Sequence, residues 1–266
     1  MAGRLAGKTA IVVGAGQQPG ETVGNGRAIA LTFAREGASI LCVDREETRA
    51  RAIAHEIVDE GGTAQALAVD VTDPAAGDAI AAQCAAGWPP DILVYNVGIG
   101  AAGDGPVHRH DDAAFARIFE VNFSGARRIT RAVLPLMRAR EKGAIVTVSS
   151  LASIAGANML GYEVSKAALN RLTISIARAN AKHGVRANGI LPGLMDTPMA
   201  MVGTSQRDGR SIEDQRKARD AMVPLKGGMG SGWDTAAAAL FLASDEAKFI
   251  TGVLLPVDGG ASTRVG

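Results

Sequence analysis

Short, almost wholly apolar runs alternate with helical stretches along the whole chain, and this alternation constrains the fold more than any other feature. The runs are apolar at nearly every position rather than at every second one, as is typical of strands buried on both faces of a parallel sheet. We expect seven strands, over Thr9–Val13, Ser39–Val43, Ala64–Ala68, Ile92–Tyr95, Ala144–Val148, Arg186–Leu191 and Val253–Val257.

The stretches between these runs predict six main helices. They span Asn25–Glu36, Glu46–Asp59, Asp73–Ala85, Asp112–Arg140, Gly161–His183 and Gly232–Ala243. Asp73 followed by Pro74 is typical of a helix start, and Gly184 is typical of a helix end. Strictly alternating strands and helices predict one α/β domain over 1–266, a Rossmann-type doubly wound parallel sheet with helices on both faces.

Residues 199–232 depart from this alternation. The segment is polar and charged, with one short helical stretch near Ile212–Met222. A long excursion from a compact domain is usually a functional lid or a loose surface loop, and we favour a substrate lid.

The composition excludes several classes of protein. Hydrophobic residues make up 47% of the chain and charged residues 21%, which is enough for a sizeable core. The formal net charge of +1 argues against a nucleic-acid partner, and no apolar run is long enough to span a membrane. The N-terminus lacks the core of a signal peptide, and two cysteines, Cys42 and Cys84, exclude a disulfide scaffold. We therefore expect a cytoplasmic protein.

A glycine-rich segment follows the first expected strand and precedes the first expected helix. It runs from Gly14 to Gly26 and includes Gly24 and Asn25. Glycines at such a turn let the backbone approach a pyrophosphate, and the free N–H groups of a helix N-terminus attract negative charge. We therefore expect these four residues to bind the phosphates of a dinucleotide.

Asp44 ends the second strand, eighteen residues after Gly26. A carboxylate at this place can accept hydrogen bonds from both ribose hydroxyls of NAD and would repel the 2′-phosphate of NADP. Arg45 argues for the other cofactor, because a guanidinium could bind that phosphate. An alternative is that Asp44 only caps the helix that begins near Glu46. We favour NAD over NADP, with Asp44 and Arg45 both in the cofactor site.

Tyr162 and Lys166 lie four residues apart in the fifth expected helix and so share one of its faces. Ser149 and Ser150 end the fifth strand, at the edge where a parallel sheet binds its ligands. A phenol has an unperturbed pKa of about 10 and is a poor acid–base group at neutral pH. A lysine ammonium beside it, together with a positive nicotinamide ring, would lower that pKa. These residues predict interconversion of an alcohol and a carbonyl, with a serine holding the substrate oxygen.

Taken jointly and in order, these motifs resemble the short-chain dehydrogenase/reductase family, and the resemblance covers essentially the whole chain. Beside the glycine-rich turn, the matching positions are Asp70-Val71, Asn96-Val97-Gly98, Asn122, Ser150, Tyr162, Lys166, Pro192-Gly193, Thr197 and the terminal Thr251–Gly260 segment.

The resemblance implies a role for each matching position. Tyr162 would be the general acid/base, Lys166 would lower its pKa and bind the nicotinamide ribose, and Ser150 would orient the substrate oxygen. Asn122 would hold a water in the proton relay. Asp70 and Val71 would flank the adenine of the cofactor, and Asn96, Val97 and Gly98 would lie along the cofactor cleft. Pro192, Gly193 and Thr197 would hold the carboxamide side of the nicotinamide. The resemblance also implies a homotetramer.

Three departures from the family pattern stand out. Val13 replaces the usual Thr, and six extra residues in the 17–23 region form either a flap over the pyrophosphate or an outward bulge. The usual Asn-Asn-Ala-Gly becomes the Tyr95–Gly98 segment. Ser150 precedes Tyr162 by twelve residues where thirteen is commoner; Ser149 fits thirteen, but the pattern Ser-Ser-x-Ala favours Ser150.

Three functions remain open. The first is an NAD(H)-dependent oxidoreductase acting on a secondary alcohol or ketone of a small, cyclic or hydroxylated metabolite. The second is an NADPH-dependent reductase of 3-oxoacyl thioesters, which Asp44 disfavours. The third is a non-catalytic dinucleotide sensor, which the presence of all four catalytic-type residues disfavours. We expect no metal site, and we interpret His108–Asp112 as a solvated loop in which Asp111 or Asp112 caps the next helix.

Overall fold

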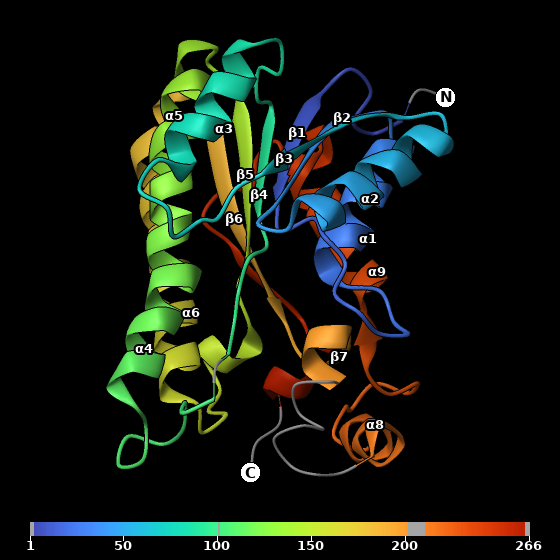
Figure 1. Ribbon diagram of the computed structural model, residues 1–266, viewed down its shortest axis with the longest axis vertical. Helices are drawn as coiled ribbons and strands as arrows, with labels where there is room; N and C mark the ends of the chain where they lie inside the picture. The colour runs from blue at the N-terminus through green and yellow to red at the C-terminus, as the bar shows by residue number, and fades with distance from the viewer. Residues whose placement is uncertain (1–2, 101, 202–210, 264–266) are drawn as a thin grey trace.

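The computed structural model describes residues 3–100, 102–201 and 211–263. A seven-stranded sheet runs in the order β3-β2-β1-β4-β5-β6-β9, with every neighbouring pair parallel (Figure 1). The strands are β1 Thr9–Val13, β2 Ser39–Asp44, β3 Thr63–Ala68, β4 Ile92–Tyr95, β5 Gly143–Val148, β6 Val185–Pro192 and β9 Leu254–Val257. The predicted fold class, a single-domain Rossmann-type α/β fold, is confirmed.

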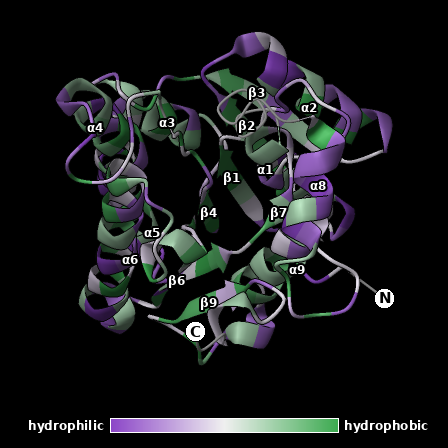
Figure 2. Cartoon of the chain, turned by 90° about the horizontal axis from the view of Figure 1, so that it is seen from below, coloured by the Kyte–Doolittle hydropathy of each residue, from purple (hydrophilic) through white to green (hydrophobic). Residues whose placement is uncertain are grey.

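Helices pack on both faces of the sheet. One hydrophobic cluster joins α1 (Asn25–Arg35), α2 (Glu47–Asp59) and α9 (Gly232–Ala243) to the strands. A second cluster joins α3 (Ala76–Ala85), α5 (Gly125–Ala139) and α6 (Leu160–Asn180) to the opposite face. Figure 2 shows the hydrophobic strands between these two layers and hydrophilic stretches on the outer helices. The sheet is thus buried on both sides, as its continuous apolar strands require.

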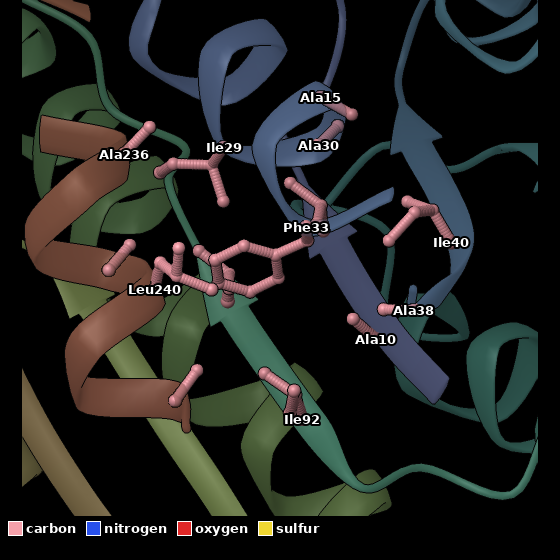
Figure 3. Close-up of a cluster of buried hydrophobic side chains, with 14 of the residues drawn as sticks. Ala10, Ala15, Ile29, Ala30, Phe33, Ala38, Ile40, Ile92, Ala236 and Leu240 are labelled. Atoms are coloured by element: carbon pink, nitrogen blue, oxygen red, sulfur yellow. The ribbon is translucent and has the colours of Figure 1, made fainter. Parts of the chain in front are cut away.

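Phe33 anchors the first of these layers. Its side chain is fully buried and points from α1 toward Leu240 of α9, above Ile92 of β4 (Figure 3). Because both helices are fixed by this packing, the N-terminus of α1 is held at the carboxyl edge of the sheet.

Three predicted helices differ in their bounds by more than one residue. The third begins at Ala76 rather than Asp73, because the Asp73 carboxylate accepts the Ala75 N–H at 2.8 Å and closes a separate turn first. The long stretch at 112–140 divides into α4 (Asp112–Phe119), a π-helical segment (Glu120–Ser124) and α5. The helix predicted at 161–183 is α6, which ends at Asn180, followed by a 3-10 turn over Ala181–His183. Gly184 ends that turn, with the left-handed φ of 68° that is typical of a helix-ending glycine. Asp111 caps α4 by accepting the Ala114 N–H.

The segment predicted as a lid is partly described. It contains α8 (Ile212–Asp220) and β8 (Gly230–Ser231), and β8 pairs with β7 (Met195–Asp196) in a small parallel sheet. Arg216 of α8 donates from Nε to an Asp196 carboxylate oxygen at 2.9 Å. Residues 202–210 of the predicted lid lie outside the described part. No helix within the described residues is long and apolar enough to span a membrane.

The strand order indicates where on the sheet a ligand would bind. From β1 the chain builds outward through β2 to β3, whereas β4 lies on the other side of β1. Ligands of open α/β sheets bind outside the carboxyl ends of the strands at such a reversal. Gly14 follows β1 and Asn96 follows β4, and the Asn96 amide donates to the Gly14 carbonyl oxygen at 2.9 Å.

Candidate active site

A cavity of about 450 Å³ opens at this edge of the sheet. Most of the predicted site residues line it, namely Gly14, Gly24, Asn25, Gly26, Asp44, Arg45, Asp70, Val71, Asn96, Val97, Gly98, Tyr162, Lys166 and Thr197. Four predicted residues are not on its wall: Asn122, Ser150, Pro192 and Gly193. The fold therefore brings the two predicted halves, the glycine-rich turn and the Tyr162–Lys166 pair, to one cavity.

Gly193 lies behind the cavity because it packs on the end of β9. Its N–H donates to the Val257 carbonyl at 3.0 Å, and a Cβ there would lie 2.6 Å from the Asp258 Cβ. Pro192 pairs with Val257 in the sheet.

The glycine-rich turn is tight enough to exclude side chains. A Cβ on Gly26 would lie 1.8 Å from the Gly14 carbonyl oxygen, and Gly14 has a φ of 84°. The α1 N-terminus lacks a side-chain cap at Gly24, and Oδ1 of Asn25, a cavity-lining residue, is buried with no hydrogen-bond partner. A helix N-terminus with free N–H groups and a close backbone approach fits the phosphates of a dinucleotide.

Gln17 closes the inserted loop with its side-chain amide. Its Oε1 accepts the Gly24 N–H at 3.0 Å, and its Nε2 donates to the Thr22 carbonyl at 3.0 Å. At the tip of the loop, a Cβ on Gly20 would lie 3.0 Å from the Pro198 side chain, and Pro198 lines the cavity. Of the two arrangements left open by the sequence, this geometry favours a flap over the cleft rather than an outward bulge.

Asp44 ends β2 and faces the glycine-rich turn. Its two carboxylate oxygens accept the N–H groups of Gly16 and Glu46, both at 3.1 Å. A carboxylate offers about four lone-pair sites, so ribose hydroxyls could still bind. Arg45 is largely exposed and lies 3.4 Å from the Glu46 carboxylate. Arg49, which sequence reasoning missed, also lines the cavity; its place in the first turn of the helix that follows Asp44 is the signal that could have found it.

Asp70 follows β3, and its side chain bonds to Thr72, two residues later in the chain. Its carboxylate accepts both the N–H and the hydroxyl of Thr72, at 2.8 and 2.7 Å. These hydrogen bonds lower the pKa of Asp70, so it stays ionised at the adenine end of the predicted site.

Tyr162 lies in the first turn of α6, and Asp104 fixes that turn. The Asp104 carboxylate accepts the N–H groups of Gly161 at 2.8 Å and Tyr162 at 3.0 Å. Gly161 permits this approach, since a Cβ there would be only 3.3 Å from the carboxylate. Asp104 thus caps a helix fifty-seven residues away in the sequence, a relation that no local pattern reveals.

Burial is the largest influence on the pKa values of Tyr162 and Lys166. It raises the pKa of Tyr162, while a hydrogen bond with the Ser150 side chain acts in the opposite direction. Lys166 is 2% exposed, and burial lowers its pKa to about 8. Its Nζ donates to the Val148 carbonyl at 3.0 Å and lies 5.8 Å from the centre of the Tyr162 ring. The lysine charge is therefore close to the phenol and is lost at moderately alkaline pH.

The two adjacent serines have different partners. The Ser149 hydroxyl is buried and donates to the Lys166 carbonyl at 3.1 Å, whereas the Ser150 side chain reaches the Tyr162 phenol. Ser150 therefore has the better position to act with Tyr162, although Ser149 fits the commoner spacing.

Asn122 sits fully buried in the π-helical segment, behind the cavity wall. Its side-chain oxygen accepts the Ile99 N–H at 2.8 Å, and its Nδ2 donates to the Ile99 carbonyl and to the Ser165 hydroxyl, both at 3.0 Å. Ser165 in turn donates to the Tyr162 carbonyl at 2.8 Å. The amide thus links the loop after β4 to the helix that carries Tyr162 and Lys166.

Comparison with known proteins defines the class. A family model described as enoyl-(acyl carrier protein) reductase matches residues 21–262. Oxidoreductase UcpA of Escherichia coli (strain K12) is 35% identical over 98% of this chain and 96% of its own length. The 3-oxoacyl-(acyl-carrier-protein) reductase FabG of the same strain is also 35% identical, over 96% of this chain and 97% of its own. The chain therefore belongs to the short-chain dehydrogenase/reductase family and is an oxidoreductase of that type.

Two solved structures agree with this membership. A candidate short-chain dehydrogenase/reductase from Burkholderia xenovorans is 40% identical, with a TM-score of 0.93 over 100% of both chains. A candidate NAD(P)-dependent gluconate 5-dehydrogenase from Beutenbergia cavernae, with bound NADP at low occupancy, is 34% identical, with a TM-score of 0.85 over 98% of both chains.

Proposed function

We propose that the protein interconverts a secondary alcohol and a ketone of a small metabolite, using NAD(H). The observation that carries the proposal is the half-buried Tyr162 phenol with Lys166 beside it, both on the wall of the cavity that the glycine-rich turn also lines, and with Ser150 hydrogen-bonded to the phenol. A nicotinamide dinucleotide supplies or accepts the hydride when bound. The chain's own residues then need to bind the substrate oxygen and move one proton.

Tyr162 is the proposed general acid and base. In the reductive direction its hydroxyl gives a proton to the carbonyl oxygen, and in the oxidative direction it takes the hydroxyl proton of the alcohol. Because burial raises its pKa, the phenol needs a nearby positive charge to ionise, and Lys166 holds that charge below pH of about 8. Ser150 donates a hydrogen bond to the substrate oxygen and keeps it within reach of the phenol.

The cofactor preference rests on Asp44, which lies in the cavity wall. We propose NAD as the preferred cofactor, with Asp44 accepting the ribose hydroxyls. Side-by-side titrations of the purified protein with NADH and NADPH, followed by nicotinamide fluorescence, test this. We expect tighter binding of NADH and a shift toward NADPH in Asp44→Ala. Tighter NADPH binding by the wild type would instead assign the subsite to Arg45 and Arg49.

A second candidate is reduction of 3-oxoacyl thioesters with NADPH, supported by the 35% identity to FabG over nearly the whole chain. Both candidates are tested by one rate panel. It pairs NAD or NADP with cyclohexanol and gluconate, and NADH or NADPH with acetoacetyl-CoA. Turnover of an alcohol with NAD supports the proposal, and turnover of acetoacetyl-CoA with NADPH supports the alternative. A protein that binds the dinucleotide but turns over neither class would favour the sensor hypothesis. A homotetramer in the cytoplasm remains our expectation for the assembly and location.

A further inference from the structure

The helix that carries Asn122 is irregular at one carbonyl group. In a regular α-helix the Gly125 N–H would donate to the Val121 carbonyl, four residues earlier. Here it donates to the Glu120 carbonyl instead, which makes Glu120–Ser124 a π-helical segment. The Val121 carbonyl accepts a hydrogen bond from the phenol of Tyr95 at 2.6 Å. A side chain from the end of β4 has thus taken the place of a backbone donor.

The surroundings of Tyr95 are shaped to hold this hydroxyl. Tyr95 is completely buried, and burial raises its pKa far above the physiological range, so the phenol keeps the proton that it donates. Gly125 leaves the space that the oxygen needs, since a Cβ there would lie 2.6 Å from it. Arg128 secures the segment from the other side, with one nitrogen on the Val71 carbonyl and another on the Glu120 carboxylate.

The irregular segment presents Asn122 to the catalytic helix. One residue after Val121, the Asn122 amide holds both backbone groups of Ile99 and the Ser165 hydroxyl. A return to regular α-helix would shift the segment by up to one residue, a rotation of about 100°. Asn122 could not then keep all of these bonds.

We propose that Tyr95 is a positioning residue for the reaction, acting through the π-helical segment to hold Asn122 in its bonding register. The proposal rests on the proposed function, because the register matters for turnover only if Tyr162 and Lys166 are catalytic. It gives a role to one departure from the family pattern, the tyrosine in the Tyr95–Gly98 segment. Tyr95 touches neither substrate nor cofactor in this account, so it acts only through Asn122.

The first test is amide hydrogen exchange of the full-length protein, read at the Ile99 N–H by mass spectrometry with fragmentation. Tyr95→Phe removes only the hydroxyl, and we expect Ile99 to exchange at least about tenfold faster. The matched control is Ser244→Ala, which removes a buried hydroxyl-to-carbonyl hydrogen bond at the C-cap of α9, a helix on the opposite face of the sheet from α5 and α6. It should leave Ile99 unchanged. Unchanged exchange at Ile99 in Tyr95→Phe would overturn the proposal.

The second test separates positioning from general stability. The substrate is the one in the rate panel that the wild type turns over fastest. With it, we expect Tyr95→Phe to lower kcat at least about tenfold and to leave the NADH dissociation constant unchanged. Ser244→Ala should keep both values. If Tyr95→Phe does not fold, Gly125→Ala disturbs the same contact from the helix side and should accelerate Ile99 exchange. The exchange test needs no substrate, so its result does not depend on the proposed function. A failure of the proposed function would instead show as turnover that survives in Tyr162→Phe. Equal kcat in wild type and Tyr95→Phe would contradict the proposed role.

Discussion

Lys166 is a buried cation that weakens the fold, and its replacement by methionine should reveal by how much. Burial lowers its pKa from 10.5 to about 8. A difference of that size between the unfolded and folded states amounts to about 3 kcal/mol of unfolding free energy below pH 8. Lys166→Met removes this penalty but leaves the Val148 carbonyl without its donor, which costs about 1–3 kcal/mol. At pH 7 we therefore expect the variant to be as stable as the wild type or up to about 2 kcal/mol more stable, although catalytically inactive.

The difference in unfolding free energy between Lys166→Met and the wild type should change with pH, and this change is a stricter test than its value at one pH. Between pH 8 and 10.5 the unfolded state binds more protons at Lys166 than the folded state does, so this residue's contribution to wild-type stability rises with pH. Burial raises the pKa of Cys84 to about 11 and that of Cys42 to about 12, and these groups lower stability at alkaline pH. Both thiols are present in both proteins, so their effect cancels in the difference.

Urea unfolding at one protein concentration, followed by the fluorescence of Trp88 and Trp233, measures this difference from pH 7 to pH 10. The stability of Lys166→Met relative to the wild type should fall by about 2–3 kcal/mol over that range. A difference that stays constant within about 0.5 kcal/mol would refute the reasoning, because it would mean that Lys166 has an ordinary pKa in the folded protein.

Two further substitutions test the geometry of the site. Gly26→Ala places a Cβ 1.8 Å from a backbone oxygen, so we expect NADH binding to weaken at least about tenfold, whereas Gly156→Ala, with open space around it, should bind normally. NADH titration decides, and normal binding by Gly26→Ala would contradict the tight turn. Asp104→Ala removes the cap of the Tyr162 helix and should lower kcat about tenfold with NADH binding retained. Ser244→Ala, which removes only a hydroxyl-to-carbonyl hydrogen bond at the end of α9, is its control; equal kcat in the two variants would show that Asp104 does not position Tyr162.

The seven strands of the main sheet could be predicted because burial on both faces of a parallel sheet leaves a strong apolar signal. The helix bounds were less predictable where side chains compete with the backbone. Asp73 closes its own turn instead of starting α3, and the Tyr95 hydroxyl inserts into a helix whose sequence at 112–140 gives no sign of a break.

For the site, too, some features could be predicted from the sequence and others could not. Residues at strand ends, such as Asp44 and Asn96, could be placed because the fold brings those ends together. The contacts of Gln17 and Asp104 could not, since they depend on loops that meet only in three dimensions. The close packing of Gly193 on Asp258 could not be predicted either, because sequence order alone does not tell what each side of a strand end faces.

In the proposed reaction Tyr162 moves the proton, while the other residues of the cavity bind the dinucleotide. Tyr162→Phe removes one oxygen atom and leaves the Asp104 bond to the Tyr162 backbone in place. Its kcat should be measured with the substrate of the rate panel that the wild type turns over fastest, alongside an NADH titration. We predict that turnover is lost while the NADH dissociation constant stays close to that of the wild type. Turnover at a near wild-type rate would contradict the account.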